Sequence, residues 1–163
     1  MYDFKIEAAD KATLYADLES ALEGLVDGEP DGIANMANAA ALLWETLPGI
    51  NWVGFYRVVA GDNGPELVLG PFQGRPACVR IPFGQGVCGA AAATRKVQLV
   101  EDVHAFPGHI ACDSASNSEI VVPIIRNGEL LGVLDIDSPS HARFDAEDQA
   151  GCVRLAEIMA TVL

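Results

Sequence analysis

Residues 119–137 read EIVVPIIRNGELLGVLDID, and this stretch predicts more of the fold than any other part of the chain. Two runs of β-branched and aliphatic residues flank Asn127-Gly128, a residue pair that favours a tight hairpin turn. Pro123 has no backbone N–H and removes one hydrogen bond from the ladder, which indicates a sheet edge or a bulge near it. We therefore expect two antiparallel strands, over residues 119–126 and 129–137.

Further strands are expected upstream of this hairpin. Residues 51–60, NWVGFYRVVA, are β-branched and aromatic, and a turn at 61–64 joins them to a second strand near 66–69. Short strands are expected at 78–81 and 97–100, with a short helix over 87–95 between them. Residues 101–118 form a long irregular stretch, which we interpret as a binding loop because such connections in compact domains are usually functional.

Helices are expected on both sides of the strand-rich region. Leucines at helical spacing over 11–26 indicate an amphipathic helix, and Asp31 offers an N-cap to a second helix over 31–47. The face of this second helix that we expect to be covered carries Ile33, Ala37, Ala40, Ala41, Trp44 and Leu47. A closing helix is expected over 144–163, with a packed face formed by Cys152, Leu155, Ala156 and Met159.

This order of elements predicts one α+β domain over residues 1–163. Its sheet of about six strands should be mostly antiparallel, with helices packed chiefly on one face. The sheet and its loops span 51–138, between the helices at 11–26 and 31–47 and the closing helix at 144–163. No linker, internal repeat or low-complexity segment divides the chain.

The composition excludes some classes of partner. Ten basic and 23 acidic residues give a net charge of −13, which repels phosphate backbones and anionic lipids. Neither nucleic acid nor a membrane is therefore expected, and a zwitterionic or cationic small ligand fits better. No apolar run approaches the roughly 18–20 residues that span a bilayer. The N-terminus, MYDFKIEAADK, is unlike a secretory signal, so a cytoplasmic location is expected.

Three of the four cysteines, Cys78, Cys88 and Cys112, lie within residues 78–119. The cytosol keeps thiols reduced, so catalysis, metal binding or plain burial are the roles to consider. Several thiols suit a chain that breaks and remakes a disulfide. Cys88 falls in the first turn of the expected helix, whose positive end lowers the pKa of a thiol. Burial alone is the alternative for Cys78 and Cys88, and it is the prediction for Cys152.

Acidic and aromatic residues on the strands indicate a pocket. Asp135 and Asp137 are two residues apart and so face the same side of an apolar strand, where carboxylates are costly unless they are solvated or partnered. Trp52 and Tyr56 share a face of their strand, as a pocket wall or as ordinary core aromatics.

Two sets of residues are candidate metal ligands. They are His104, His109 and Cys112, or Cys88, His109 and Cys112. The spacing of the first set matches no standard site, and no metal is expected. A structural metal site at the second set is an alternative, which stoichiometric metal in the purified protein would favour.

Six short strings carry a more specific signal: GPFQG (70–74), AC (77–78), GQGVCG (84–89), FPGHIACD (106–113), SEIV (118–121) and GVLDIDS (132–138). Together they resemble the free methionine-(R)-sulfoxide reductases, a family of GAF-domain enzymes, and the likeness runs from about residue 52 to 138. The resemblance implies a GAF fold and the reduction of the R epimer of free methionine sulfoxide.

The resemblance also implies roles for single residues. Cys112 would be the nucleophile, and Cys78 and Cys88 would be the thiols that resolve its sulfenic acid into a disulfide. The substrate's ammonium and S–O groups would contact three acids, Glu119, Asp135 and Asp137. Its methyl group would contact an aromatic wall formed by Trp52 and Tyr56.

An external dithiol such as thioredoxin would reduce the disulfide, with no metal or organic cofactor. Backbone N–H groups of residues 108–118 are expected to bind the substrate carboxylate, and a homodimer is expected. The alternative is a GAF module that binds a small ligand without turnover.

Strand parity sets a condition on the three acids. A plain two-residue turn at 127–128 pairs position 119 with position 136, which places Glu119 on the face opposite Asp135 and Asp137. All three acids share a pocket only if the register shifts by one, through a bulge near Pro123 or a longer turn. The other solution is that Glu119 precedes the regular pairing.

Overall fold

The structure is a computed structural model of the chain, and it describes residues 6, 10–108 and 115–163. Its helices are α1 (Lys11–Val26), α2 (Gly32–Thr46), α3 (Gly86–Thr94) and α4 (Ala146–Val162), with a 3-10 turn η1 (Val103–Ala105). Its strands are β1 (Trp52–Gly61), β2 (Gly64–Gly74), β3 (Arg80–Pro82), β4 (Gln98–Val100), β5 (Ser118–Arg126) and β6 (Glu129–Ser138).

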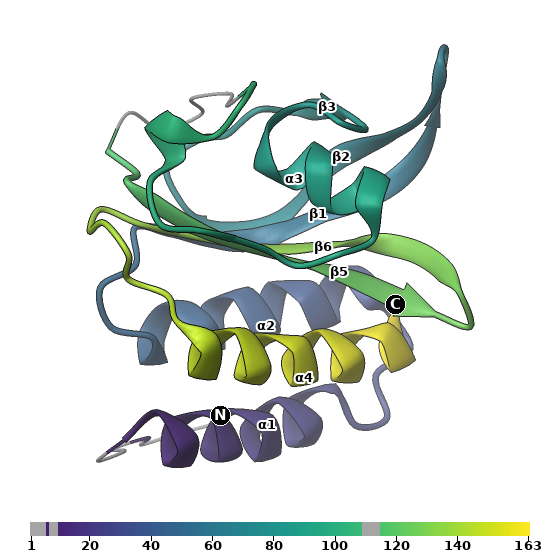
Figure 1. Ribbon diagram of the computed structural model, residues 1–163. Coiled ribbons are helices and arrows are strands. Elements are labelled where there is room, and N and C mark those ends of the chain that lie inside the picture. Colours follow the sequence, from purple (N-terminus) through teal and green to yellow (C-terminus); the bar gives the residue numbers. More distant parts are fainter. Residues whose placement is uncertain (1–5, 7–9, 109–114) are drawn as a thin grey trace.

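The six strands form one antiparallel sheet in the order β3-β2-β1-β6-β5-β4. Helices α2 and α4 cover one face of the sheet, and α1 packs beneath them as an outer layer, whereas α3 lies on the opposite face (Figure 1). The prediction of an antiparallel sheet with helices chiefly on one face is therefore confirmed. The chain forms an α+β domain of stacked layers.

Two apolar cores lie on the two sides of the sheet. Alternation along β1 sends Val53 and Phe55 into the core beneath the sheet, which α1, α2 and α4 complete. The same alternation sends Trp52 and Tyr56 into a smaller core beneath α3. The acidic residues Glu119, Asp135 and Asp137 lie on the α3 side of the sheet, beside the smaller core. Helices α1, α2 and α4 support the sheet from its other side.

The predicted covered face of α2 is wrong in part. Ile33 and Trp44 are 46% and 41% exposed, and Ala37 and Ala41 are exposed as well. Of the predicted face, Ala40 and Leu47 are buried, and Met36, Ala39 and Leu43 pack inward beside them. The helix is apolar on most sides, so its pattern does not fix which face turns inward. The polar residue Asn35 also lies on the buried face, where its Nδ2 donates to the Glu29 carbonyl at 3.0 Å.

Most other differences concern where elements end. Strand β2 runs from 64 to 74 rather than 66 to 69, and β3 begins at Arg80 rather than at position 78. Helix α4 begins at Ala146 because Asp145 caps it, accepting from the N–H groups of Glu147 and Asp148. The expected irregular stretch 101–118 contains η1.

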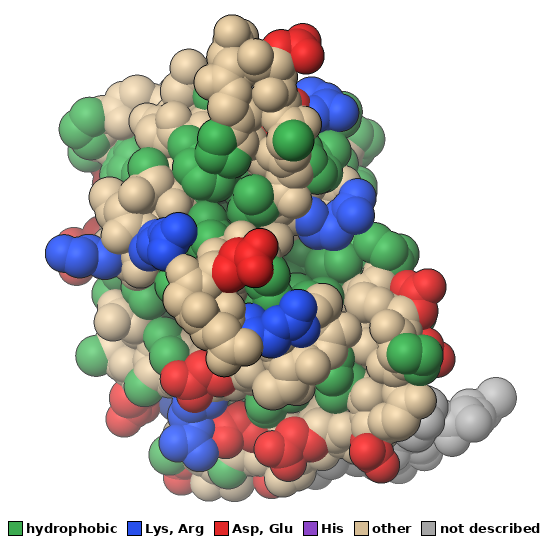
Figure 2. Space-filling model, turned by 90° about the vertical axis from the view of Figure 1, so that its right-hand side faces the viewer, with side chains coloured by type: hydrophobic (Ala, Val, Ile, Leu, Met, Phe, Trp, Pro, Cys, Tyr) green, Lys and Arg blue, Asp and Glu red, His purple; other side chains and the backbone are tan. Residues whose placement is uncertain are grey.

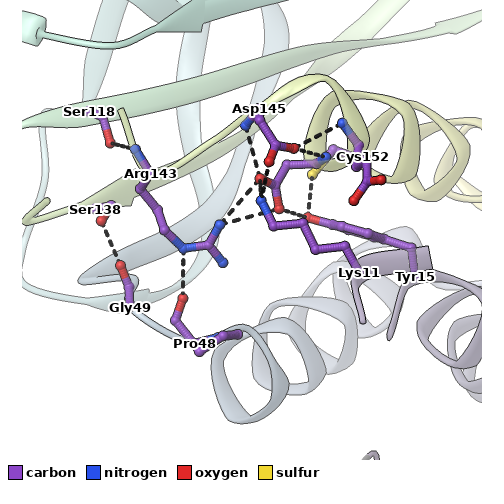
Figure 3. Close-up of polar contacts among 11 residues, drawn as sticks. Lys11, Tyr15, Pro48, Gly49, Ser118, Ser138, Arg143, Asp145 and Cys152 are labelled. Atoms are coloured by element: carbon purple, nitrogen blue, oxygen red, sulfur yellow. Dashed lines mark hydrogen bonds and ion pairs between the residues drawn. The ribbon is translucent and has the colours of Figure 1, made fainter. Parts of the chain in front are cut away.

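A buried polar cluster ties α1 to the start of α4 (Figure 3). Asp148 is fully buried; it accepts from the Tyr15 hydroxyl at 3.0 Å and from Arg143 Nη1 at 3.2 Å, and it pairs with Lys11. The Arg143 backbone N–H in turn donates to Ser118 Oγ at 3.3 Å. The cluster therefore also fixes the first residue of β5, next to Glu119.

The surface reflects the charge of the chain. In Figure 2, acidic side chains gather along the lower part of the face shown, over the helical layers. Within the described residues, no helix is both long enough and apolar enough to cross a membrane.

Candidate active site

The three predicted acids lie on one face of the sheet. Glu119 pairs directly with Asp137, and Asp135 follows two residues along β6. The register shifts between Ile124 and Ile125, where Leu131 is the extra residue on β6. This bulge lies one residue beyond Pro123, so the predicted register shift is confirmed, and it brings Glu119 to the face of the two aspartates.

Strand β1 adds the aromatic wall beside these acids. Trp52 pairs with Asp137 across the β1–β6 ladder. Trp52 and Tyr56 are both buried, with stacked rings whose centroids are 6.0 Å apart. The rings of Trp52 and Phe72 also stack, at 5.3 Å. The aromatic face is therefore part of the small core and also borders the carboxylates.

Gly54 makes this close stacking possible. It pairs with Asp135, between Trp52 and Tyr56 on the same face of β1. A Cβ at this position would lie 2.3 Å from the Cβ of Phe72 and 2.7 Å from the Trp52 ring, so any side chain would displace the stack. The residue without a side chain keeps the wall flat next to Asp135.

The two aromatic side chains also position the segment that carries Cys78. Trp52 Nε1 donates to the Arg75 carbonyl, and the Tyr56 hydroxyl donates to the Cys78 carbonyl, each at 3.0 Å. Cys78 is half-buried and disulfide-bonded, whereas Cys88 and Cys152 are free thiols. Cys78 therefore borders the pocket wall on a segment held by two partly buried hydrogen bonds.

Helix α3 places Cys88 over the acids. Cys88 lies in the first turn of α3, as expected, and is 5% exposed. Its Sγ donates to Asp135 Oδ2 at 3.2 Å. The Gly84 N–H donates to the Gly89 carbonyl at 2.8 Å, and the Gly86 N–H donates to the Gly108 carbonyl at 3.2 Å. These bonds hold the start of the helix against the loop at 108.

The expectation of a lowered pKa for Cys88 is wrong. Burial is the largest cause and raises the pKa of this thiol well above its usual value, and the charges of Asp135 and Glu119 raise it further. The positive end of α3 does not offset the loss of solvent and the nearby carboxylates. Cys88 is therefore a thiol, not a thiolate, at neutral pH.

The same crowding raises the pKa of the carboxyl groups in this cluster. Burial, then Asp135 and Asp137, raises the pKa of Glu119 well above its usual range. Burial raises the pKa of Asp135 to about 6, against the lowering effect of hydrogen bonds from Cys88 and Glu119. The enclosed site therefore favours the protonated form of Glu119, while Asp135, with a pKa of about 6, is mostly ionised at pH 7.

A cavity of about 50 Å³ lies among these groups, several times the roughly 10–15 Å³ that one water needs. It brings together six of the predicted site residues, Trp52, Tyr56, Cys88, Glu119, Asp135 and Asp137. Three polar lining residues were missed by sequence reasoning, Arg75, Gln85 and Ser116. Arg75 directly follows the string GPFQG, and Gln85 lies inside GQGVCG. Their positions beside or within these strings could therefore have indicated them as site residues.

The remaining predicted residues are placed as follows. Cys112 and His109 lie outside the described residues, so their roles stay predictions. Cys152 is fully buried in the core beneath the sheet, as expected. His104 Nε2 lies 3.1 Å from Asn117 Oδ1 at an exposed position.

The described residues offer one set of candidate metal ligands. It comprises Cys88, Glu119 and Asp135, whose ligand atoms all lie within 4.8 Å of one another. This set shares only Cys88 with the sets considered from the sequence.

Comparisons with known proteins agree with this geometry. The model of the GAF domain family matches residues 36–163. The chain is 53% identical over 163 residues to Protein YtsP of Bacillus subtilis, covering 100% of this chain and 99% of that one. It is 51% identical over 154 residues to the free methionine-R-sulfoxide reductase of Escherichia coli, covering 94% and 91%. The free methionine-R-sulfoxide reductase of Neisseria meningitidis, solved in complex with its substrate, superposes with a TM-score of 0.92 at 48% identity, covering 99% and 95%.

Proposed function

The chain belongs to the GAF-domain family, among the free methionine-R-sulfoxide reductases, and we propose that it reduces free L-methionine (R)-S-oxide to L-methionine. The observation that carries the proposal is the cross-strand pair of Glu119 and Asp137, with Asp135 beside it, facing a cavity with an aromatic wall. A free amino acid has an ammonium group that such acids bind. A methionine residue within a protein chain has no such group.

The acids have different roles, because they differ in protonation state. Ionised Asp135 attracts the substrate's ammonium, together with Asp137. Glu119, whose protonated form is favoured by burial and by the neighbouring aspartates, donates its proton to the sulfoxide oxygen. Trp52 and Tyr56 give the S-methyl group an apolar surface. A sulfoxide becomes a better electrophile once its oxygen is protonated, so the buried acid activates the S–O bond.

Sulfur chemistry follows from that activation. The Cys112 thiolate attacks the activated sulfoxide, methionine leaves, and Cys112 becomes a sulfenic acid that carries the oxygen. A second thiol then condenses with it, forming a disulfide and releasing water. Cys78 suits the resolving role because two partly buried hydrogen bonds hold its segment at the pocket wall. Cys88 suits it less, since burial and nearby carboxylates disfavour its thiolate.

The catalytic cycle then needs only a reductant. An external dithiol such as thioredoxin returns the disulfide to two thiols, with no metal or organic cofactor in the reaction. A cytoplasmic location is part of the proposal, because that compartment keeps thiols reduced and so supplies the dithiol that the cycle needs.

Two further features complete the proposal. Arg75 lines the cavity and joins the backbone N–H groups of residues 108–118 as a partner for the substrate carboxylate. A homodimer is proposed because the exposed face of α2 carries Ile33 and Trp44, whose apolar surface a second copy would cover.

The deciding experiment supplies both epimers of free methionine sulfoxide and a dithiol to the wild type and to Cys112→Ser. We expect loss of the R epimer alone, and no loss with the variant. Cys152→Ser is the matched control, because that thiol lies in the opposite core and should leave the rate unchanged. Equal consumption of both epimers, or activity in Cys112→Ser, contradicts the proposal. Tight binding without turnover would instead favour a small-ligand sensor.

A further inference from the structure

The thiol and carboxyl groups over the cavity form a second kind of site. We propose that Cys88, Glu119 and Asp135 bind one Zn²⁺-class divalent cation, and that the bound cation inhibits the enzyme. The binding part of this inference stands on the geometry alone. The inhibition part rests on the proposed function.

The donor atoms already lie close to a coordination geometry. All three are within 4.8 Å of one another, and Cys88 Sγ is 3.2 Å from Asp135 Oδ2. Zn–S and Zn–O bonds of usual length separate the ligand atoms of a tetrahedral zinc by roughly 3.3–3.7 Å. Side-chain shifts of about 1 Å therefore suffice, without movement of the strands or of α3.

An independent observation is that one oxygen of Asp135 has no hydrogen-bond partner, although the carboxyl group interacts with Cys88 and Glu119. Asp135 is 6% exposed, and its Oδ1 is buried without a hydrogen-bond partner. Such an oxygen costs stability until a donor or a cation meets it. Asp135 also lines the cavity, so the unsatisfied oxygen is next to a space that an ion can occupy.

Charge favours a cation at this position. A thiolate and two carboxylates place three negative charges together, and Asp137 adds another from the same face of β6. Of the described residues that line the cavity, Arg75 is the single Lys or Arg. A divalent ion relieves this repulsion, and the thiolate ligand selects zinc-like ions over magnesium or calcium.

Binding and catalysis then compete for the same groups. A metal on Glu119 removes the proton that activates the sulfoxide, and a metal on Asp135 takes the anion that meets the ammonium. The fourth position of the ion faces the cavity, where a water completes the coordination. Metal binding releases the Cys88 proton to solvent, so affinity should rise with pH.

Binding is tested in a variant from which the other two reactive thiols, Cys78 and Cys112, have been removed. The reduced Cys78→Ser/Cys112→Ser variant is titrated with ZnCl₂ by calorimetry, and with CdCl₂ by the ultraviolet absorption of the new cadmium–sulfur bond. We expect one ion per chain. Adding Cys88→Ser should weaken binding at least tenfold and abolish the absorption band, whereas adding Cys152→Ser should change neither. Glu119→Gln should weaken binding without removing the band. Far-ultraviolet circular dichroism checks that each variant is folded.

The outcomes separate the two proposals. No binding in the double variant, or a band that survives Cys88→Ser or disappears with Cys152→Ser, overturns the metal site. Inhibition is measured in a single turnover of pre-reduced wild type without added dithiol. Zinc should block methionine formation, excess substrate should raise the zinc concentration required, and a chelator should restore the reaction. Inhibition that excess substrate does not relieve contradicts the shared site, and inactivity without metal counts against the proposed function alone.

Discussion

Glu119 on β5 lies directly opposite Asp137 on β6, and one extra residue in β6, Leu131, sets that pairing. Without the bulge, the side chain of Glu119 would point into the helical core on the other side of the sheet. The bulge therefore creates a buried acid cluster from two strands that otherwise read as ordinary apolar core. The proposed chemistry depends on this cluster.

The first prediction concerns the proton on Glu119. Glu119→Gln keeps the size of the side chain but has no acidic proton, so kcat should fall by about 100-fold, the usual scale of general acid catalysis. Glu129→Gln, at an exposed position at the start of β6, is the matched control and should keep full activity. Steady-state kinetics on both variants, with melting curves to check folding, decide the matter; a Glu119→Gln enzyme of normal kcat would refute the acid role.

The second prediction concerns stability and pH. Asp135 has a pKa of about 6 in the folded state against an ordinary value of 3.8, so the folded state binds its proton more tightly than the unfolded chain does. Raising the pH from about 4 to about 7 should therefore lower the free energy of unfolding.

Asp135→Asn tests this by removing the titration. The free energy of unfolding of each protein is measured by urea denaturation. From pH 4 to pH 7, the difference between variant and wild type should shift in favour of the variant by about 1–3 kcal/mol. A constant difference between the two proteins from pH 4 to pH 7 would show that Asp135 does not titrate as stated.

The third prediction concerns the buried cluster around Asp148. Asp148→Asn leaves Lys11 and Arg143 without their shared charge, and should lower the free energy of unfolding by about 3 kcal/mol. Glu147→Gln, at an exposed neighbouring position, should have a much smaller effect. Urea unfolding of both proteins measures the difference, and equal small losses would mean that the buried ion pairs contribute nothing net.

The fourth prediction concerns assembly. If α2 forms the homodimer contact, Trp44→Asp places a charge in that contact and should convert a dimer into a monomer in sedimentation experiments. Asp17→Asn on the exposed side of α1 is the control and should leave the mass unchanged. A wild type that sediments as a monomer at all concentrations removes the proposal.

The sequence predicted most of the elements and one important relationship between them. The hairpin at 119–137 and the parity of its acids required a register shift near Pro123, and the shift is present at the next residue pair. Local rules suffice here, because alternation and turn length together fix which side chains share a face.

Features that depend on distant packing were not predicted. The covered face of α2 is decided by contacts with the sheet and α4, and its apolar residues surround the helix too evenly to reveal it. The raised pKa of Cys88 comes from burial beside Asp135, which is 47 positions away in sequence. The Tyr15–Asp148 bond joins residues 133 apart. Local sequence patterns do not predict contacts between residues so far apart in the chain.

The most direct test of the central claim is a single turnover of pre-reduced protein with methionine (R)-sulfoxide and no added dithiol. The account predicts one methionine formed per chain, the loss of two thiols, and a peptide map with one new disulfide between Cys78 and Cys112. Methionine formed without thiol loss, or thiols unchanged after incubation with the R epimer, would contradict it.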